Sequence, residues 1–190
     1  IKCWDKALEL NPKNAYAWTN KGYALRDLGK HEEALKCYDK AIELKPNAIE
    51  VWNNKGYTLD DLGKHEEAIK CYDKSIELDP KDSLAWYNKG FILNNLKKYE
   101  ESIKCWDKAL ELNPKNAYAW KNKGYALGRL GKNEEAIKCY DKTIELNPKD
   151  VDAWCNKGSA LDDLDKNEES LECLNKVIEL DPKFSASWNN

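Results

Sequence analysis

Residues 49–82 read IEVWNNKGYTLDDLGKHEEAIKCYDKSIELDPKD, and this stretch decides the fold. Trp52, Leu59 and Leu62 recur at the spacing of an amphipathic helix, in which residues three, four and seven apart share one face. Gly63 follows at a position typical of a helix stop, because glycine adopts the left-handed backbone without steric cost. The pattern predicts a first helix that ends beside Gly63.

A second helix is predicted directly after this turn. Glu66 and Glu67 are expected to open it, since carboxylates are favoured near the positive end of a helix dipole. Its apolar face runs from Ala68 to Leu78, and Pro80 ends it because the residue before a proline disfavours helical backbone. Polar side chains that can cap the next first helix are expected at Asn14, Asp82, Asn116 and Asp150.

The same pattern recurs along the whole chain with a period of 34 residues. A period of this size predicts stacked helical units instead of one globular core. The residues that recur are Pro12, Pro46, Pro80, Pro114, Pro148 and Pro182; Trp18, Trp52, Trp86, Trp120, Trp154 and Trp188; Gly22, Gly56, Gly90, Gly124 and Gly158; and Cys3, Cys37, Cys71, Cys105, Cys139 and Cys173.

This pattern resembles the tetratricopeptide repeat, which pairs Trp, Gly, small residues, an aromatic residue and a final Pro at this period. The resemblance implies an all-α fold, a right-handed superhelical solenoid of antiparallel helix pairs that forms a single array over residues 1–190. The matching residues of the first full repeat are Trp18, Gly22, Ala34, Tyr38, Ala41 and Pro46. The expected parts are a leading second helix at 1–14, full repeats at 15–48, 49–82, 83–116, 117–150 and 151–184, and a truncated start at 185–190.

Some residues depart from the family pattern. Lys97 and Asp165 stand at the turn glycine, and Ser102 and Ser170 stand at a small alanine. A lysine also follows each repeated tryptophan from Trp18 to Trp154 by three residues. Its stem is expected to cover core surface while the ammonium reaches water, with a cationic ladder for an acidic ligand as the alternative. The tryptophans themselves are expected in the core. The lysines are Lys21, Lys55, Lys89, Lys123 and Lys157.

Composition excludes several classes of protein. The 190 residues include 31 basic and 34 acidic side chains, a net charge of −3, and charged residues interrupt every apolar run. A membrane span and a nucleic-acid partner, including a pentatricopeptide-type RNA reader, are therefore not expected. With two histidines, no phosphate-binding glycine loop and no nucleophile motif, we expect no enzyme active site, no metal and no cofactor.

The cysteines indicate a reducing compartment. Cysteines one repeat apart lie on helices whose axes are about 8–10 Å apart, whereas a disulfide needs Cα atoms within about 7 Å. We expect free thiols and a cytoplasmic location. Cys155 lies off this pattern and is expected to be an ordinary substitution, with a reactive thiol as the alternative.

The resemblance implies that first helices line a concave groove that binds extended peptides or helices. Positions are counted here from the residue three before each tryptophan, and positions 2, 5, 6, 9, 12 and 13 are expected to face the groove. Position 6 is always asparagine, whose amide both donates and accepts hydrogen bonds and so can pair with any peptide backbone. A similar asparagine ladder is known in the repeat domain of O-linked N-acetylglucosamine transferases. The alternative is a solvated asparagine copied by duplication. This asparagine column is Asn20, Asn54, Asn88, Asn122 and Asn156.

Other groove positions carry aromatic and charged side chains. Position 9 is Tyr23, Tyr57, Phe91 and Tyr125, which act either as contact anchors or as packing between first helices. The charged groove positions predict that the sign of charge changes from repeat to repeat along the groove, as a ligand would meet it. The alternative is that these charges only make the surface soluble. The expected zones are acidic at Glu50, Asp60 and Asp61; apolar at Leu84, Tyr87 and Phe91; basic at Lys121 and Arg129; and acidic at Asp152, Asp162 and Asp163. The set of lysines and asparagines that clamps a chaperone's terminal carboxylate is not present.

These features favour a non-catalytic scaffold for protein or peptide partners. The alternatives are a targeting or regulatory domain of a larger enzyme, such as a glycosyltransferase, and a self-associating spacer. We expect the chain to be part of a longer polypeptide, because its first residue is Ile1 and the sequence contains no Met. End-to-end association is expected from the apolar face of Trp4, Ala7 and Leu8 at one end and Trp188 at the other.

Overall fold

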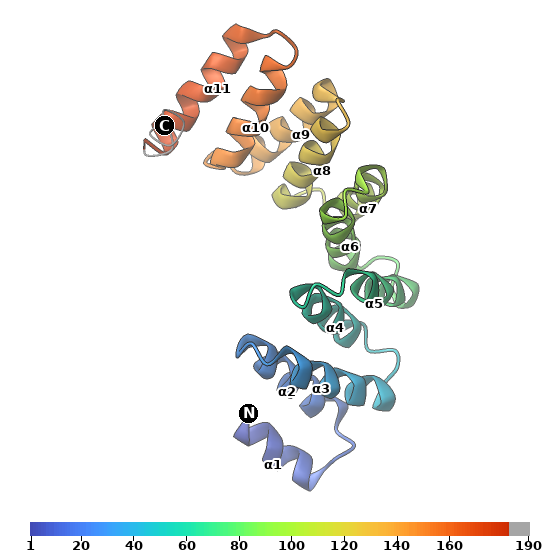
Figure 1. Ribbon diagram of the computed structural model, residues 1–190. Helices are drawn as coiled ribbons and strands as arrows, with labels where there is room; N and C mark the ends of the chain where they lie inside the picture. Colours follow the sequence, from blue (N-terminus) through green and yellow to red (C-terminus); the bar gives the residue numbers. More distant parts are fainter. Residues whose placement is uncertain (183–190) are drawn as a thin grey trace. The chain divides into compact units, whose positions relative to one another are not determined.

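The computed structural model describes residues 1–182, and the chain forms two compact units, residues 1–92 and 93–190. Within the described residues all regular structure is helical, which confirms the all-α fold (Figure 1). Trp188 and the expected sixth repeat lie outside the described residues. The helices are α1 Lys2–Leu10, α2 Ala15–Asp27, α3 His31–Leu44, α4 Ile49–Asp61, α5 His65–Leu78, α6 Ser83–Asn95, α7 Tyr99–Leu112, α8 Ala117–Arg129, α9 Asn133–Leu146, α10 Val151–Asp162 and α11 Asn167–Leu180.

Each unit is built from antiparallel helix pairs that pack in chain order. In the first unit α1 packs on α2, α2 on α3, α3 on α4 and α4 on α5. In the second unit α7 packs on α8, α8 on α9, α9 on α10 and α10 on α11. First helices of successive repeats also touch, α2 against α4 and α8 against α10. Within each unit, the contacts among the described helices thus join successive helices or successive repeats, as expected of a repeat array.

The predicted helix ends are confirmed. Asn14 accepts a hydrogen bond from the Ala17 backbone N–H at 3.1 Å, and Asp82, Asn116 and Asp150 cap their helices in the same way. Such a cap satisfies one of the free N–H groups at a helix start. In the turn, Gly63 has φ +71°, and the non-glycine residues Lys97 and Asp165 keep the same backbone at φ 59° and 57°.

Position 8 must be small because the second helix places an aromatic ring against it. A Cβ built on Gly124 would lie 2.7 Å from the Tyr140 ring, and one on Gly56 would lie 3.0 Å from Tyr72. In the last repeat Leu174 replaces the aromatic residue and is exposed, so a Cβ on Gly158 would meet its nearest atom only at 3.4 Å. The glycine at position 8 thus leaves room for the aromatic ring of the second helix in most repeats.

Trp18, Trp52, Trp86, Trp120 and Trp154 are half-buried, and Trp120 packs against the buried core cluster, so the tryptophans meet the expected core position only in part. Each indole N–H donates a hydrogen bond to the carbonyl of the proline six residues earlier, at distances of 2.8–3.1 Å. Trp52, for example, donates to the Pro46 carbonyl. The tryptophan therefore ties the start of each first helix to the loop before it, and the buried core is formed mainly by residues such as Ala34, Tyr38 and Leu59.

The lysine after each tryptophan forms an ion pair with the preceding second helix. The Lys Nζ to Asp Oδ1 distances lie between 2.5 and 2.7 Å, so the ammonium does not simply extend into water as expected. The ammonium groups of Lys55 and Lys123 also lie 5.9 and 5.5 Å from the ring centroids of Trp52 and Trp120. The pairs are Lys21–Asp5, Lys55–Asp39, Lys89–Asp73, Lys123–Asp107 and Lys157–Asp141, named here the Lys–Asp ladder.

The cysteines are free thiols, as predicted. Burial raises the pKa of Cys71 and of Cys139 to about 11. Cys155 is half-buried, and burial together with the nearby Asp152 carboxylate raises its pKa, which disfavours the reactive-thiol alternative. At the amino-terminal end Leu8 is buried and Trp4 packs edge-on against Tyr16, with ring centroids 6.3 Å apart.

Candidate functional site

The asparagine column lies on the first helices, with all five side chains half-exposed. Asn20 donates from Nδ2 to the Tyr16 carbonyl at 2.9 Å. Among residues 1–182, the side-chain amides of Asn54, Asn88 and Asn156 form no hydrogen bond within the chain. These three amides are free to pair with another backbone.

The aromatic residues at position 9 are exposed side chains on the same helices. Tyr23, Tyr57, Phe91 and Tyr125 expose 46, 48, 40 and 41% of their surface. Fully packed aromatic residues would be expected to lose nearly all of this area. Packing between first helices therefore accounts for only part of each ring, and the rest is available for contact.

In the first unit, groove positions from α4 and α6 meet around one hollow of about 380 Å³. Asp60 Oδ1 lies 2.9 Å from Nδ1 of His65, and Asp61 Oδ2 lies 3.9 Å from Nδ1 of His31. Residues that the sequence analysis assigned to positions 5, 6, 9, 12 and 13 are thus brought together, and Tyr72 of α5 joins them. The lining residues are Tyr57, Asp60, Asp61, Tyr72, Tyr87, Asn88 and Phe91.

Arg26 stands at groove position 12, but the sequence did not indicate that it contacts the aromatic residues of this face. Its guanidinium carbon lies 4.6 Å from the centroid of the Tyr23 ring and 4.8 Å from that of the Tyr57 ring. The guanidinium also contacts Asp27 at 3.1 Å. The sequence does carry a signal for this contact. Arginine stands at position 12, and aromatic residues stand at position 9 of the same repeat and of the next one.

In the second unit, a hollow of about 360 Å³ lies between α8 and α10 and reaches α9. Arg129 is exposed, and its guanidinium carbon lies 6.0 Å from the Tyr99 ring centroid. Sequence reasoning missed Asn133, which donates to Asp163 at 3.3 Å across this hollow. Both signs of charge therefore meet here, in place of a purely basic zone. The lining residues are Tyr125, Gly128, Arg129, Asn133, Tyr140, Asn156, Ser159, Ala160 and Asp163.

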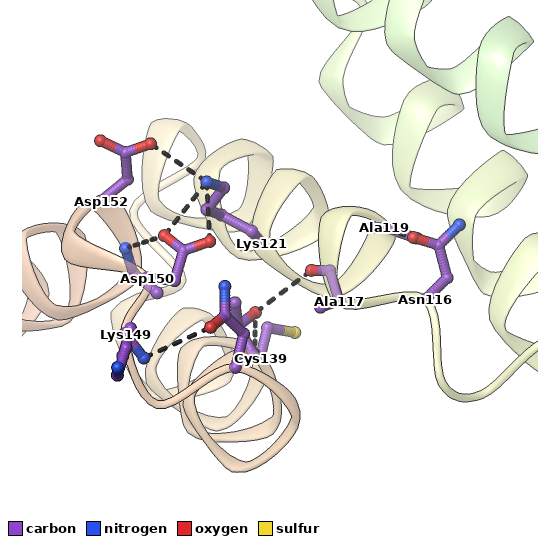
Figure 2. Close-up of polar contacts among 11 residues, drawn as sticks. Asn116, Ala117, Ala119, Lys121, Cys139, Lys149, Asp150 and Asp152 are labelled. Carbon is purple, nitrogen blue, oxygen red and sulfur yellow. Dashed lines mark hydrogen bonds and ion pairs between the residues drawn. The ribbon is translucent and has the colours of Figure 1, made fainter.

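Lys121 does not offer a free positive charge to the groove. Its Nζ donates to both carboxylate oxygens of Asp150, at 3.1 and 3.0 Å, and to Asp152 at 3.0 Å (Figure 2). Burial alone would lower the pKa of Lys121, but the hydrogen bonds to the two carboxylates outweigh it and the pKa lies above 10.5. The predicted basic zone is thus narrower than expected, because Asp150 and Asp152 neutralise this ammonium. An adjoining hollow of about 330 Å³ is lined by Lys121, Asn122, Tyr125, Asp152, Cys155 and Asn156.

Residues 1–182 lack two further features, a metal-binding cluster and a membrane-spanning helix. This part of the chain has no cluster of three or more His, Cys, Asp or Glu side chains able to hold a metal ion. None of its helices combines the length and the apolar character needed to cross a membrane.

The family model described as tetratricopeptide repeat matches residues 15–48, 49–82, 83–116, 117–150 and 151–184. The chain belongs to the tetratricopeptide repeat (TPR) family. The five TPR matches have the bounds predicted from the sequence. A shorter similarity, to the protein prenyltransferase alpha subunit repeat, covers residues 1–28. No curated protein matches the sequence.

Solved structures of other TPR-like proteins share the fold. The MamA protein has a TM-score of 0.83 at 25% identity, over 90% of this chain and 94% of that chain. MamA from Desulfovibrio magneticus RS-1 has a TM-score of 0.83 at 25% identity, over 89% of this chain and 96% of that chain. YrrB, described as a TPR protein with an unusual peptide-binding site, has a TM-score of 0.81 at 27% identity, over 94% of this chain and 92% of that chain. These likenesses support a protein-interaction scaffold.

Proposed function

We propose that this chain is a non-catalytic scaffold whose first helices bind an extended peptide segment of a partner protein. The observation that carries the proposal is the asparagine column, in which Asn54, Asn88 and Asn156 present amides with no hydrogen bond within residues 1–182. A peptide backbone offers one donor and one acceptor per residue, which an asparagine amide matches irrespective of the peptide's side chains.

The spacing of the column suits an extended chain. Neighbouring packed helices lie about 8–10 Å apart, and an extended peptide rises about 3.3 Å per residue. One asparagine can therefore engage about every third peptide residue. The exposed rings at position 9 lie one helical turn further along the same helices and offer apolar contact to the peptide's side chains. The likeness to YrrB, a TPR protein described as having a peptide-binding site, supports the same role.

The proposed partner is a protein, and the proposed location is cytoplasmic. Free thiols throughout the array support a reducing compartment. The near-balanced charge supports a protein partner over a nucleic acid, because phosphate binding needs an excess of basic side chains.

Selection from a phage-displayed library of random dodecapeptides, followed by fluorescence anisotropy with the recovered peptides, tests the proposal. The variant is Asn54→Ala/Asn88→Ala. The matched control is Asn47→Ala/Asn175→Ala, which removes two exposed asparagines that lie off the first helices. Circular dichroism checks that both variants keep their helix content.

We expect the groove variant to bind recovered peptides about 10- to 100-fold more weakly, because each lost amide removes about 0.5–1.5 kcal/mol of hydrogen bonding. The control variant should bind like the wild type. Equal loss in both variants, or no loss in either, would show that the asparagine column does not bind the peptide. Failure to recover any peptide would overturn the proposal as a whole.

A further inference from the structure

Arg26 shows what the aromatic column can hold. Its guanidinium lies between the exposed rings of Tyr23 and Tyr57, 4.6 and 4.8 Å from their centroids, on successive first helices. A guanidinium is weakly hydrated and planar, so it stacks on aromatic faces while a neighbouring carboxylate balances its charge. Asp27, the residue after Arg26, supplies that carboxylate at 3.1 Å.

One repeat later, the equivalent space between the aromatic residues at position 9, Tyr57 and Phe91, has no arginine of the described residues 1–182 beside it. Position 12 is Asp60 in place of Arg26, and position 13 is Asp61, the equivalent of Asp27. The space beside Tyr57 and Phe91 is a hollow of about 380 Å³ that both carboxylates line. The aromatic residues at position 9 are thus kept in this repeat, whereas an aspartate, Asp60, stands where the preceding repeat has Arg26.

The carboxylates are not neutralised by lysine or arginine. Within residues 1–182 neither Asp60 nor Asp61 forms an ion pair with a lysine or arginine; Asp60 contacts the imidazole of His65, and Asp61 that of His31. Lys55, Lys64 and Lys89 of the same unit form ion pairs with Asp39, Glu32 and Asp73 instead. The hollow therefore places two carboxylates beside aromatic surface.

We propose that this hollow binds an arginine side chain of the bound peptide, stacked on Tyr57 and Phe91 and paired with Asp60 and Asp61. The inference rests on the proposed function, since it assigns a side chain to a peptide held by the asparagine column. Paired carboxylates accept the parallel N–H groups of a guanidinium, which makes such pairs shorter and stronger than neutral hydrogen bonds. Lysine would gain the charge attraction but not the planar stacking.

The test uses the same peptide library at pH 8, where imidazole is largely uncharged. Selections are made on the wild type, on Asp60→Asn/Asp61→Asn and on Asp60→Arg. The last variant recreates the Arg-Asp pair found at Arg26 and fills the hollow with the chain's own guanidinium. The matched control is Glu66→Gln/Glu67→Gln, which removes the same charge from exposed residues of α5.

We expect peptides selected on the wild type to share an arginine at one aligned position. Asp60→Asn/Asp61→Asn and Asp60→Arg should each weaken their binding about tenfold or more, and the control should not. A peptide with glutamine in place of that arginine should bind the wild type and Asp60→Asn/Asp61→Asn equally. Peptides without an aligned arginine, or equal affinity for Asp60→Asn/Asp61→Asn, would overturn this inference while leaving the scaffold proposal intact. If Asn54→Ala/Asn88→Ala leaves binding unchanged, the asparagine column does not hold the peptide, and failure to recover any peptide would overturn the scaffold proposal.

Discussion

Adding one methyl group to Gly124 should have the opposite effect from adding it to Gly128, although both glycines lie in α8. The Cβ of an alanine at position 124 would lie 2.7 Å from Cε1 of Tyr140 and 3.0 Å from Cδ1 and Cζ. Carbon atoms in contact are normally about 3.5–4.0 Å apart. For an alanine in place of Gly128, the atom nearest to the added Cβ is Oδ1 of Asn133, at 4.0 Å.

These distances set the expected free energies of unfolding. Alanine gains up to about 1 kcal/mol over glycine in a helix, so Gly128→Ala should stabilise the array by about 0.5–1 kcal/mol. For Gly124→Ala the same gain is opposed by overpacking, which costs about 1–3 kcal/mol in a rigid core. Because the Tyr140 ring is buried, it cannot simply turn away, and a net loss of up to about 2 kcal/mol is expected.

Urea and thermal unfolding followed by circular dichroism would measure both changes. For a chain of this size about 1 kcal/mol corresponds to about 2–4 °C in Tm. Gly158→Ala is a second control, because Leu174 replaces the aromatic ring there and the nearest atom lies at 3.4 Å. We expect that variant to be neutral or slightly stabilised. Equal stability of Gly124→Ala and Gly128→Ala would refute the argument that ring contact fixes the glycine.

Three further predictions concern the turn and the thiols. Lys97→Gly should raise the free energy of unfolding by about 0.5–1 kcal/mol by relieving the φ of 59°, whereas Lys98→Gly, at φ −86°, should lower it; thermal melts of both would decide. A thiol-specific dye at pH 8 should label the exposed Cys3 quickly and Cys71 very slowly, because burial raises the Cys71 pKa to about 11; fast labelling of Cys71 in the folded chain would contradict this. The same shift stabilises the fold below about pH 9, and this stability should fall as the pH rises towards 11, since the unfolded chain loses the proton first.

Local chemistry in the sequence was sufficient to predict the helix pairs. The acidic pair Glu66–Glu67 marks the start of α5, and Asp79 with Pro80 marks its end after Leu78. Capping, dipole and proline effects act within a few residues, so a sequence pattern reports them directly. The equivalence of Lys97 to a glycine also followed from its place in the period, and its positive φ confirms it.

Contacts that depend on tertiary packing could not be predicted in the same way. Lys55 and Asp39 are 16 residues apart in different helices, and only the packing of α4 on α3 brings them together. The sequence predicts Lys121 in a basic zone, because its two acceptors lie 29 and 31 residues away along the chain. The stacking of Arg26 could not be predicted, because it needs rings from two repeats. A side chain's charge is visible in a sequence, but its partner depends on packing.

The Lys–Asp ladder makes the repeats interchangeable. Each full repeat from 15–48 to 117–150 has the lysine on its first helix and the aspartate on its second, so any of them could follow any other with the pairing intact. Inserting or deleting a whole 34-residue unit would preserve every such pair, whereas shifting the boundary by a few residues would break one. The contacts that join successive repeats are therefore the same at each junction. The groove positions of each repeat can then change, and bind different ligands, without disturbing these contacts.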